Sequence, residues 1–432
     1  MARTVNKGGR KTLSTPRMAA YARESGRTRA LSVRAGDTAT AHTPEPLSAP
    51  GRQPTARQSL ASRTAFFRVP REGTPYFLAF TAKLSPGLAA NGATSYVPAT
   101  IAGRTSDRLK RSVKDGDTIG IAFDGSQSIR FLGIDTPEKS FKAPFRLDRN
   151  GDPVFVDIGL HAAAWDAYLK DAITPGGQHN VPLGQPLRQR LAQRITPGVA
   201  ANHALLAAAA SKALFDHVSK DVVDLANGQL DAFGIFGAMA HEPFDGYGRI
   251  LAFLRPEQRD VPPAQRRIEY NTRQLAVGAA LPYFIWPNVE PFRKATLISE
   301  AVFPPPVLRQ RARASRSLKQ ARDAVRAARQ ARAPNTVFDP QRPLQLAAFE
   351  LRFLADRRAP SRVVVDLAAA DNEPILWPAE AYFVVPNPED RLYVPVEYLA
   401  LFKQNGWRDP TAPELAAKIA AAPDVGPTGL PL

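Results

Sequence analysis

The clearest pattern of apolar and polar positions predicts a pair of antiparallel strands in the first third of the chain. Ser112–Phe123 and Ser126–Ile134 both carry alternating apolar residues typical of strands. Asp124-Gly125 lies between them, and this dipeptide is a strong signal for a two-residue hairpin turn. Pro137 ends the second run, because proline cannot donate to a strand ladder.

Periodicity and turn signals predict further elements along the chain. An Ala-rich stretch predicts a long helix over 199–225, with apolar side chains near helical spacing at Leu205, Leu206, Leu214, Val218 and Val222. Two short strands are expected within 63–82. Other strands are predicted at 229–239, 249–254, 363–367, 381–385 and 392–394, and other helices at 158–173, 271–278, 291–300, 307–333 and 396–403.

The chain is too long, at 432 residues, for a single compact core, so several domains are expected. The predicted organisation is an α+β protein with a disordered basic N-terminal arm and a small C-terminal α+β accessory domain. Its segments are the arm (1–60), an extended segment (61–107), a main domain (108–302) with an insertion at about 139–198, a basic helix or linker (303–333) and the accessory domain (334–432).

Net charge is the strongest global feature of the composition. The chain carries +17, and two segments account for nearly all of it. Residues 1–60 hold eleven Lys and Arg against three acidic residues, and residues 307–333 hold nine against one, which gives +8 in each. Two basic segments on a nearly neutral body predict a polyanionic partner, most simply nucleic acid. Basic tails that only keep the protein soluble, and a solvated linker helix at 307–333, are the alternatives.

The chain contains no cysteine, which excludes disulfides, thiolate metal sites and a cysteine nucleophile. No apolar run reaches the length of a membrane span, and no apolar segment of a signal peptide follows the basic start. The sequence therefore predicts no membrane association and a cytoplasmic location, with export by a leaderless or specialised route left open.

Four charged residues cluster around the predicted hairpin. Asp117 opens one strand, Asp135 closes the other, Arg130 lies inside the second strand and Glu138 follows it. Two carboxylates suit a hard cation such as Ca²⁺, an arginine suits a phosphate, and a nearby glutamate suits a general base. Each residue alone has a plainer explanation as part of a turn, a strand end or a cap.

The combination resembles the staphylococcal nuclease (thermonuclease) family. The motifs that carry the resemblance are, in order, Asp115–Thr118, Ile129–Glu138, Tyr247–Phe253 and Asn271–Ala280. The resemblance covers roughly residues 108–302. It implies a five-stranded OB-fold β-barrel with packed helices, one Ca²⁺, and a hydrolase that cleaves phosphodiester bonds of DNA, RNA or both.

The resemblance also implies a role for each matching residue. Asp117 and Asp135 would be carboxylate ligands of Ca²⁺, and the backbone carbonyl of Thr136 a third ligand. Glu138 would orient or deprotonate the attacking water.

On the substrate side, Arg130 and Arg249 would bind the scissile phosphate and stabilise its transition state. Tyr247 matches a tyrosine that contacts nucleotide phosphate in the family. Tyr283 and Trp286 would belong to an aromatic stacking platform.

Two other readings of the chain remain. One is a catalytically inactive module of the same type, which keeps only binding to nucleic acid or protein. The other is a nuclease effector or toxin whose terminal segments serve delivery. The complete set of Asp117, Asp135, Glu138, Arg130 and Arg249 favours an active enzyme.

Overall fold

The computed structural model describes residues 65–71, 74–85, 109, 112–122, 126–245, 247–295 and 297–431. The predicted basic arm at 1–60 and the Asp124-Gly125 turn lie outside these residues, as does most of the extended segment at 61–107. Residues 53–432 belong to one compact unit. Among the described residues, no helix has both the length and the apolar character needed to cross a bilayer.

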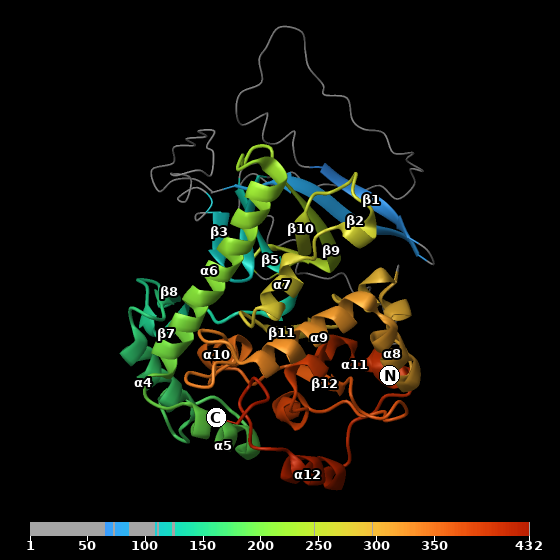
Figure 1. Cartoon of the computed structure of the whole chain (residues 1–432). Helices are drawn as coiled ribbons and strands as arrows, with labels where there is room; N and C mark the ends of the chain where they lie inside the picture. Colours follow the sequence, from blue (N-terminus) through green and yellow to red (C-terminus); the bar gives the residue numbers. More distant parts are fainter. Residues whose placement is uncertain are drawn as a thin grey trace, which may run out of the picture. The chain divides into compact units, whose positions relative to one another are not determined.

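The α+β class is confirmed. The largest sheet has the strand order β1-β2-β9-β10-β5-β4-β3 (Figure 1). Its strands are β1 (Ala65–Arg71), β2 (Thr74–Lys83), β9 (Gly234–Phe244), β10 (Ile250–Pro256), β5 (Ser126–Phe131), β4 (Thr118–Ala122) and β3 (Val113–Asp115). The predicted hairpin is present as the antiparallel β4–β5 pair, and β5 pairs in parallel with β10.

Two smaller sheets complete the β-structure. One has the order β12-β13-β11-β6 and the other pairs β7 with β8. Their strands are β6 (Gly133–Asp135), β7 (Ser140–Leu147), β8 (Pro153–Asp157), β11 (Leu281–Ile285), β12 (Arg362–Asp366) and β13 (Arg391–Pro395). The described strands thus form open sheets and no closed five-stranded barrel, because β1 and β2 extend one sheet beyond β9 while β6 and β11 join the C-terminal strands.

Nine α-helices and six short 3₁₀ helices lie in the described part of the chain. The α-helices are α4 (Ala162–Ile173), α5 (Gln185–Arg194), α6 (Val199–Ala226), α7 (Tyr270–Ala276), α8 (Pro305–Ala314), α9 (Arg316–Ala331), α10 (Ala348–Ala355), α11 (Leu399–Gln404) and α12 (Ala412–Ala421). The 3₁₀ helices are η1 (Pro263–Gln265), η2 (Phe292–Lys294), η3 (Ile298–Ala301), η4 (Ala379–Val384), η5 (Pro388–Asp390) and η6 (Val396–Tyr398).

The long predicted helix is α6, which runs from the strand β3 to the helix α4 (Figure 1). Leu206, Leu214, Val218 and Val222 are buried as their spacing predicts, whereas Leu205 is on the exposed side. Because α6 contacts both regions, it links the large sheet to the insertion formed by β7, β8, α4 and α5.

Three predicted elements have a different structure. The single helix expected at 307–333 is two helices, α8 and α9, because the backbone becomes extended at Ser315. The expected helix at 291–300 is two separate 3₁₀ turns, η2 and η3, because the backbone becomes extended at Ala295. The apolar run at 381–385 forms most of the 3₁₀ helix η4 instead of a strand. This run is buried throughout, and a short buried apolar run has no periodicity that separates strand from helix.

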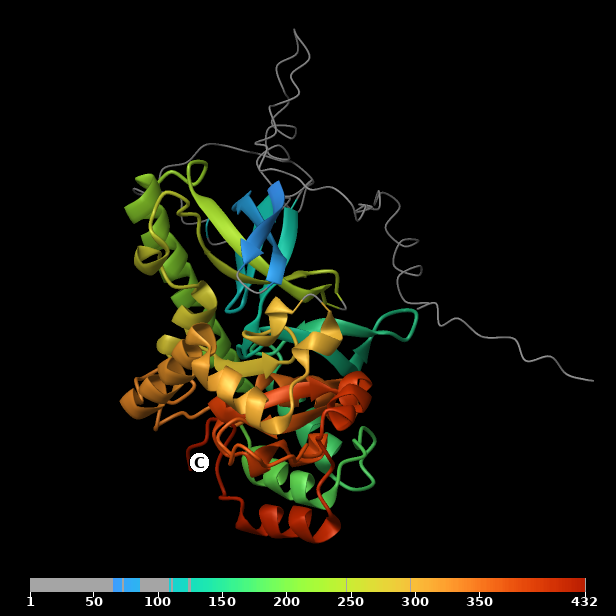
Figure 2. The same ribbon diagram turned by 90° about the vertical axis from the view of Figure 1, so that its right-hand side faces the viewer.

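Residues 334–431 share both sheet and core with the rest of the compact unit. β13 pairs in parallel with β11, at Phe284–Leu392 and Ile285–Tyr393. One hydrophobic cluster combines the insertion with the C-terminal segment, including Trp165 and Tyr382. The sequence-based boundaries at 302 and 333 therefore run through a continuous structure, which Figure 2 shows from the side.

The basic segment 307–333 is packed against acidic groups of the C-terminal segment. Arg329 binds Glu389 with both terminal nitrogens, at 2.9 and 2.6 Å, and Arg322 pairs with Asp390. Arg309 is fully buried and donates to three backbone carbonyls. Four of its basic residues (Arg309, Arg322, Arg326 and Arg329) thus bond within the fold, whereas five are exposed: Arg311, Arg313, Arg316, Lys319 and Arg332.

Candidate active site

Strand pairing brings Asp117 beside Arg130. Thr118 lies opposite Arg130 in the β4–β5 pair, and the Phe131 N–H donates to the Asp117 carbonyl at 2.8 Å. The Arg130 Nη2 consequently lies 3.2 Å from Asp117 Oδ2. The local hairpin register is therefore sufficient to place this pair.

A break after β5 brings Asp135 to the same place. Gly133 has φ of +74°, a conformation that favours glycine, and here the chain leaves the large sheet to form β6. Asp135 ends β6 and accepts a hydrogen bond from Arg130 Nη2 at 2.8 Å. Asp117 and Asp135 thus contact the same nitrogen atom, as expected for two carboxylates of one site.

The backbone of Glu138 is fixed by a buried histidine of α6. The Glu138 N–H donates to His203 Nε2 at 2.8 Å, and His203 Nδ1 lies 3.1 Å from the Leu346 carbonyl, to which it donates in this tautomer. Burial lowers the pKa of His203 to about 4, so the ring is neutral at physiological pH. His203 therefore ties Glu138 to both α6 and the segment before α10.

Arg352 of α10 reaches into the same group of carboxylates. Its Nη1 donates to Asp135 Oδ1 and to Glu138 Oε1, both at 2.8 Å, and its Nη2 donates to Asp135 Oδ2 at 2.9 Å. Arg130 Nη1 lies 4.0 Å from Glu138 Oε1. Two arginines, one from a strand and one from the C-terminal segment, thus share Asp135 and Glu138.

We name Asp115, Asp117, Asp135 and Glu138 the carboxylate cluster. Burial, followed by the charges of Asp117 and Glu138, raises the pKa of Asp115 well above its usual range. Burial also raises the pKa of Glu138, although Arg352 and Arg130 oppose this rise. Acidic groups that share a buried site are typical of functional centres, and structural ion-pair networks produce similar shifts.

The loop that carries Asp115 and Asp117 packs directly on the loop that carries Thr136. A Cβ atom added at Gly116 would lie 2.7 Å from the Ala210 Cβ and 2.9 Å from the Thr136 Cγ2. Gln274 of α7 donates to the Gly116 carbonyl at 2.7 Å. Only glycine therefore allows this close approach of the two loops.

Arg249 is anchored beside Tyr247, outside the ion pairs of the carboxylate cluster. Its Nε contacts Asp245 Oδ2 at 2.6 Å, and its guanidinium carbon is 5.3 Å from the centre of the Tyr247 ring. Arg249 directly precedes β10, and the parallel β5–β10 pair places Leu251, two residues further on, opposite Arg130.

The predicted aromatic platform is only partly present. Tyr247 is 52% exposed, and Tyr283 is partly buried with its ring stacked on Phe349. Trp286 is fully buried, and its Nε1 donates to the Ala301 carbonyl at 2.9 Å. A stacking role for Trp286 is therefore wrong, because its ring lies in the core directly after strand β11. Phe284 is also a core residue.

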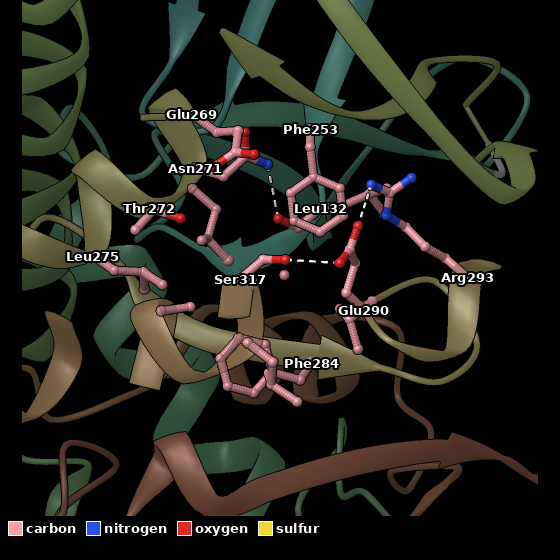
Figure 3. A pocket seen from close by; sticks show the side chains of 15 residues that line it. Leu132, Phe253, Glu269, Asn271, Thr272, Leu275, Phe284, Glu290, Arg293 and Ser317 are labelled. Atoms are coloured by element: carbon pink, nitrogen blue, oxygen red, sulfur yellow. Dashed lines mark hydrogen bonds and ion pairs between the residues drawn. The ribbon is translucent and has the colours of Figure 1, made fainter. Parts of the chain in front are cut away.

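Asn271 of the fourth motif has a structural role at the start of α7. Its Nδ2 donates to the Leu132 carbonyl at 2.8 Å (Figure 3). Its Oδ1 accepts from the Leu254 N–H at 3.0 Å. Asn271 thus stabilises the backbone at Leu132, between the end of β5 and the start of β6. The cavity drawn in Figure 3 has a volume of about 30 Å³, which suits a water molecule at most.

The carboxylate cluster offers oxygen ligands, which a hard cation such as Ca²⁺ prefers. Among the described residues, no three or more His, Cys, Asp or Glu side chains are grouped so that they could hold a metal ion. Asp117 Oδ2 is buried and accepts no hydrogen bond, despite its contact with Arg130. Such an orphaned carboxylate oxygen next to Asp135 fits a Ca²⁺ site with two carboxylate ligands, water and substrate oxygens.

Sequence reasoning missed His203 and Arg352. His203 is one of two histidines on an Ala-rich helix, without a motif around it, and Arg352 lies outside the segment that resembles the nuclease family. Asp115 belongs to the first motif of the resemblance, Asp115–Thr118, but the sequence assigned no role to it.

Comparison with known proteins adds no further information on this site. A scan against protein-family models gives no match, and a search of curated proteins gives none either.

Proposed function

We propose that this protein is a Ca²⁺-dependent nuclease that hydrolyses phosphodiester bonds of DNA, RNA or both. The observation that carries the proposal is the position of Arg130, whose terminal nitrogens lie 3.2, 2.8 and 4.0 Å from Asp117, Asp135 and Glu138. A guanidinium and three carboxylates at one point combine a phosphate contact, cation ligands and a base.

The strand arrangement supports an OB-type core for this enzyme. The strands β3, β4 and β5 form an antiparallel meander, and β5 then pairs in parallel with β10. OB-folds are five-stranded, partly open barrels that bind nucleic acid on one face. In this proposal the C-terminal strands β12 and β13 are additions to the sheet that contains β6 and β11. In a compact relative without them, β11 would be the edge strand of that sheet.

Each residue has a defined task in the proposed reaction. Asp117, Asp135 and the Thr136 carbonyl would hold the cation, which supplies positive charge to the phosphate when bound. Glu138 would accept a proton from the attacking water, and its N–H bond to His203 keeps its backbone in place.

Arg130 would bind the equatorial oxygens of the phosphate and stabilise the charge that develops on them. Arg249 would take part from the adjacent strand end, where it lies against Tyr247. Additional affinity would come through counterion release from the basic N-terminal segment and from exposed basic residues of 307–333 such as Arg316 and Arg332, since only part of that segment is engaged in internal ion pairs.

A digestion assay tests this proposal. Purified full-length protein is incubated with single-stranded and double-stranded DNA and RNA, with Ca²⁺ or with a chelator, and the ends of the products are identified. Cleavage that requires Ca²⁺ is the expected result. Absence of cleavage over a screen of metals and pH values would refute the proposal that this protein is a nuclease.

One observation favours a second candidate, an inactive module that only binds nucleic acid. Arg352 neutralises Asp135 and Glu138 directly, as a permanent structural ion pair would. In that case the protein would retard nucleic acid in a binding assay but release no products under any of these conditions.

A further inference from the structure

A cleft next to the carboxylate cluster is built from both halves of the compact unit. It has a volume of about 400 Å³, within the range of small-ligand sites. Phe141, Tyr247 and Tyr283 line it from the region that resembles the nuclease family, and residues between 349 and 393 line it from the C-terminal segment. We name it the aromatic–arginine cleft, because seven of its fifteen lining residues are aromatic and three are arginines.

Arg352 connects this cleft to the carboxylate cluster. It lines the cleft, bonds to Asp135 and Glu138, and lies 5.8 Å from the centre of the Tyr283 ring. A ligand in the cleft would therefore lie directly beside the proposed reaction centre.

Two of the aromatic side chains form a stacked pair, and a third is half exposed. Tyr283 and Phe349 stack in parallel, with ring centres 5.5 Å apart and planes 9° apart. Tyr247, half exposed, lines another part of the wall. Stacking on such rings contributes about 1–3 kcal/mol per base in single-strand binding proteins.

The charge of the cleft favours an anion. Arg352, Arg358 and Arg362 line it together with one acidic residue, Asp356. Arg362 Nη1 donates to the Tyr283 hydroxyl at 3.0 Å, while Arg362 Nε is buried and has no hydrogen-bond partner. The buried Nε is out of reach of a ligand, and the second terminal nitrogen, Nη2, is the donor left for a phosphate oxygen.

We propose that residues 349–362 form the second wall of a binding site for one or two nucleotides of a single-stranded nucleic acid. Their bases would stack in the cleft and their phosphates would contact Arg358 and Arg362, next to the scissile phosphate at Arg130. The inference rests on the proposed nuclease function, which it extends to a substrate class. A duplex does not fit, because its bases are stacked on one another and offer no free faces to the cleft.

Binding measurements on the full-length chain test this inference separately from cleavage. Glu138→Gln serves as background so that the probe stays intact, and a fluorescein-labelled oligothymidylate of twelve nucleotides is titrated by anisotropy with a blunt duplex in parallel. Arg362→Ala removes a phosphate contact. Ser361→Glu adds a negative charge at an exposed position of the cleft wall without removing a contact.

The matched controls lie elsewhere in the C-terminal segment. Arg408→Ala replaces an arginine that pairs with Glu414, and Ala420→Glu adds the same charge on exposed α12. We expect Arg362→Ala and Ser361→Glu to weaken single-strand binding about tenfold, and the controls to change it less than twofold.

Three outcomes would overturn the inference. The cleft variants could bind single strands as tightly as the controls, or duplex binding could fall as much as single-strand binding. The third outcome is that an oligoglutamate peptide binds the cleft while the oligonucleotide does not, which would indicate a protein partner. The inference and the proposed function can be distinguished. If the wild-type chain cleaves but the cleft variants bind normally, the single-strand site is refuted and the nuclease function is retained. If the cleft binds single strands but the chain cleaves nothing, the nuclease function is refuted and the single-strand site is retained.

Discussion

Arg352 holds Asp135 with two hydrogen bonds, from Nη1 to Oδ1 at 2.8 Å and from Nη2 to Oδ2 at 2.9 Å. The two residues are 217 positions apart, and both are largely buried. A proposed Ca²⁺ ligand is therefore neutralised by an arginine from a segment that lies outside the region of family resemblance. The same guanidinium also binds Glu138, so Arg352 influences both the proposed cation site and the proposed base.

Replacing Arg352 by alanine should tighten Ca²⁺ binding, because the guanidinium competes with the cation for Asp135. Without Ca²⁺ the variant should lose about 2 kcal/mol of unfolding free energy, since buried carboxylates lose their partner. Calorimetric Ca²⁺ titration and urea unfolding measure the two effects. Arg408→Ala is the control, and a Ca²⁺ affinity that is unchanged or weaker in Arg352→Ala would contradict the competition.

Glu138→Gln should lower the cleavage rate about a hundredfold or more, because an amide cannot accept a proton from water. The fold should remain intact, since the Glu138 N–H still donates to His203. Initial rates of product release at saturating substrate measure the loss. Glu397→Gln, at an exposed position, should keep the full rate. Retained turnover in Glu138→Gln would show that another group is the base.

His203 should make stability depend on pH. Burial lowers its folded-state pKa to about 4, below the ordinary unfolded value of about 6.5. The unfolded chain therefore binds the extra proton first, and stability falls as pH drops from 6.5 to 4, by about 3 kcal/mol.

His203→Gln keeps a neutral acceptor and donor at this position and removes the titration. The stability advantage of the wild type over this variant should shrink across the same pH window. Chemical unfolding at several pH values measures it, with exposed His161→Gln as control. A constant difference from pH 7 to pH 4 would mean that His203 does not titrate in this way.

Gly116→Ala should destabilise the protein by about 2 kcal/mol, because its Cβ would clash with Ala210 and Thr136. Cleavage should fall as well, since the clash separates the loop of Asp117 from the loop of Asp135. Gly151→Ala is a control with open space at the Cβ position, although its positive φ adds strain. Thermal unfolding and initial rates should then show a larger loss for Gly116→Ala in both measurements.

Truncation after Ala333 should abolish cooperative unfolding. It removes β12 and β13, leaves β11 without its parallel partner and exposes the core around α9. Circular dichroism during heating would detect the loss. Deletion of 1–52, which lie outside the compact unit, should keep a sharp transition. A sharp transition in the chain truncated after Ala333 would instead mean that the C-terminal segment is an independent addition.

Features that depend on neighbouring residues could be predicted from the sequence. The β4–β5 pair, the long helix α6 and the α+β class follow from alternation, turn signals and helical spacing, because backbone hydrogen bonding and side-chain direction repeat at fixed local periods. The meeting of Asp117, Arg130 and Asp135 belongs to this class as well, since one hairpin register and one glycine bend bring them together.

The tertiary structure alone decided which distant groups become partners. Part of the basic segment forms internal ion pairs, because Glu389 and Asp390 of the C-terminal segment pack against Arg329 and Arg322. Trp286 became a core residue and Arg352 a partner of Asp135 for the same reason. Burial and ion pairing depend on which surfaces fold against one another, and no local period in the sequence records that choice.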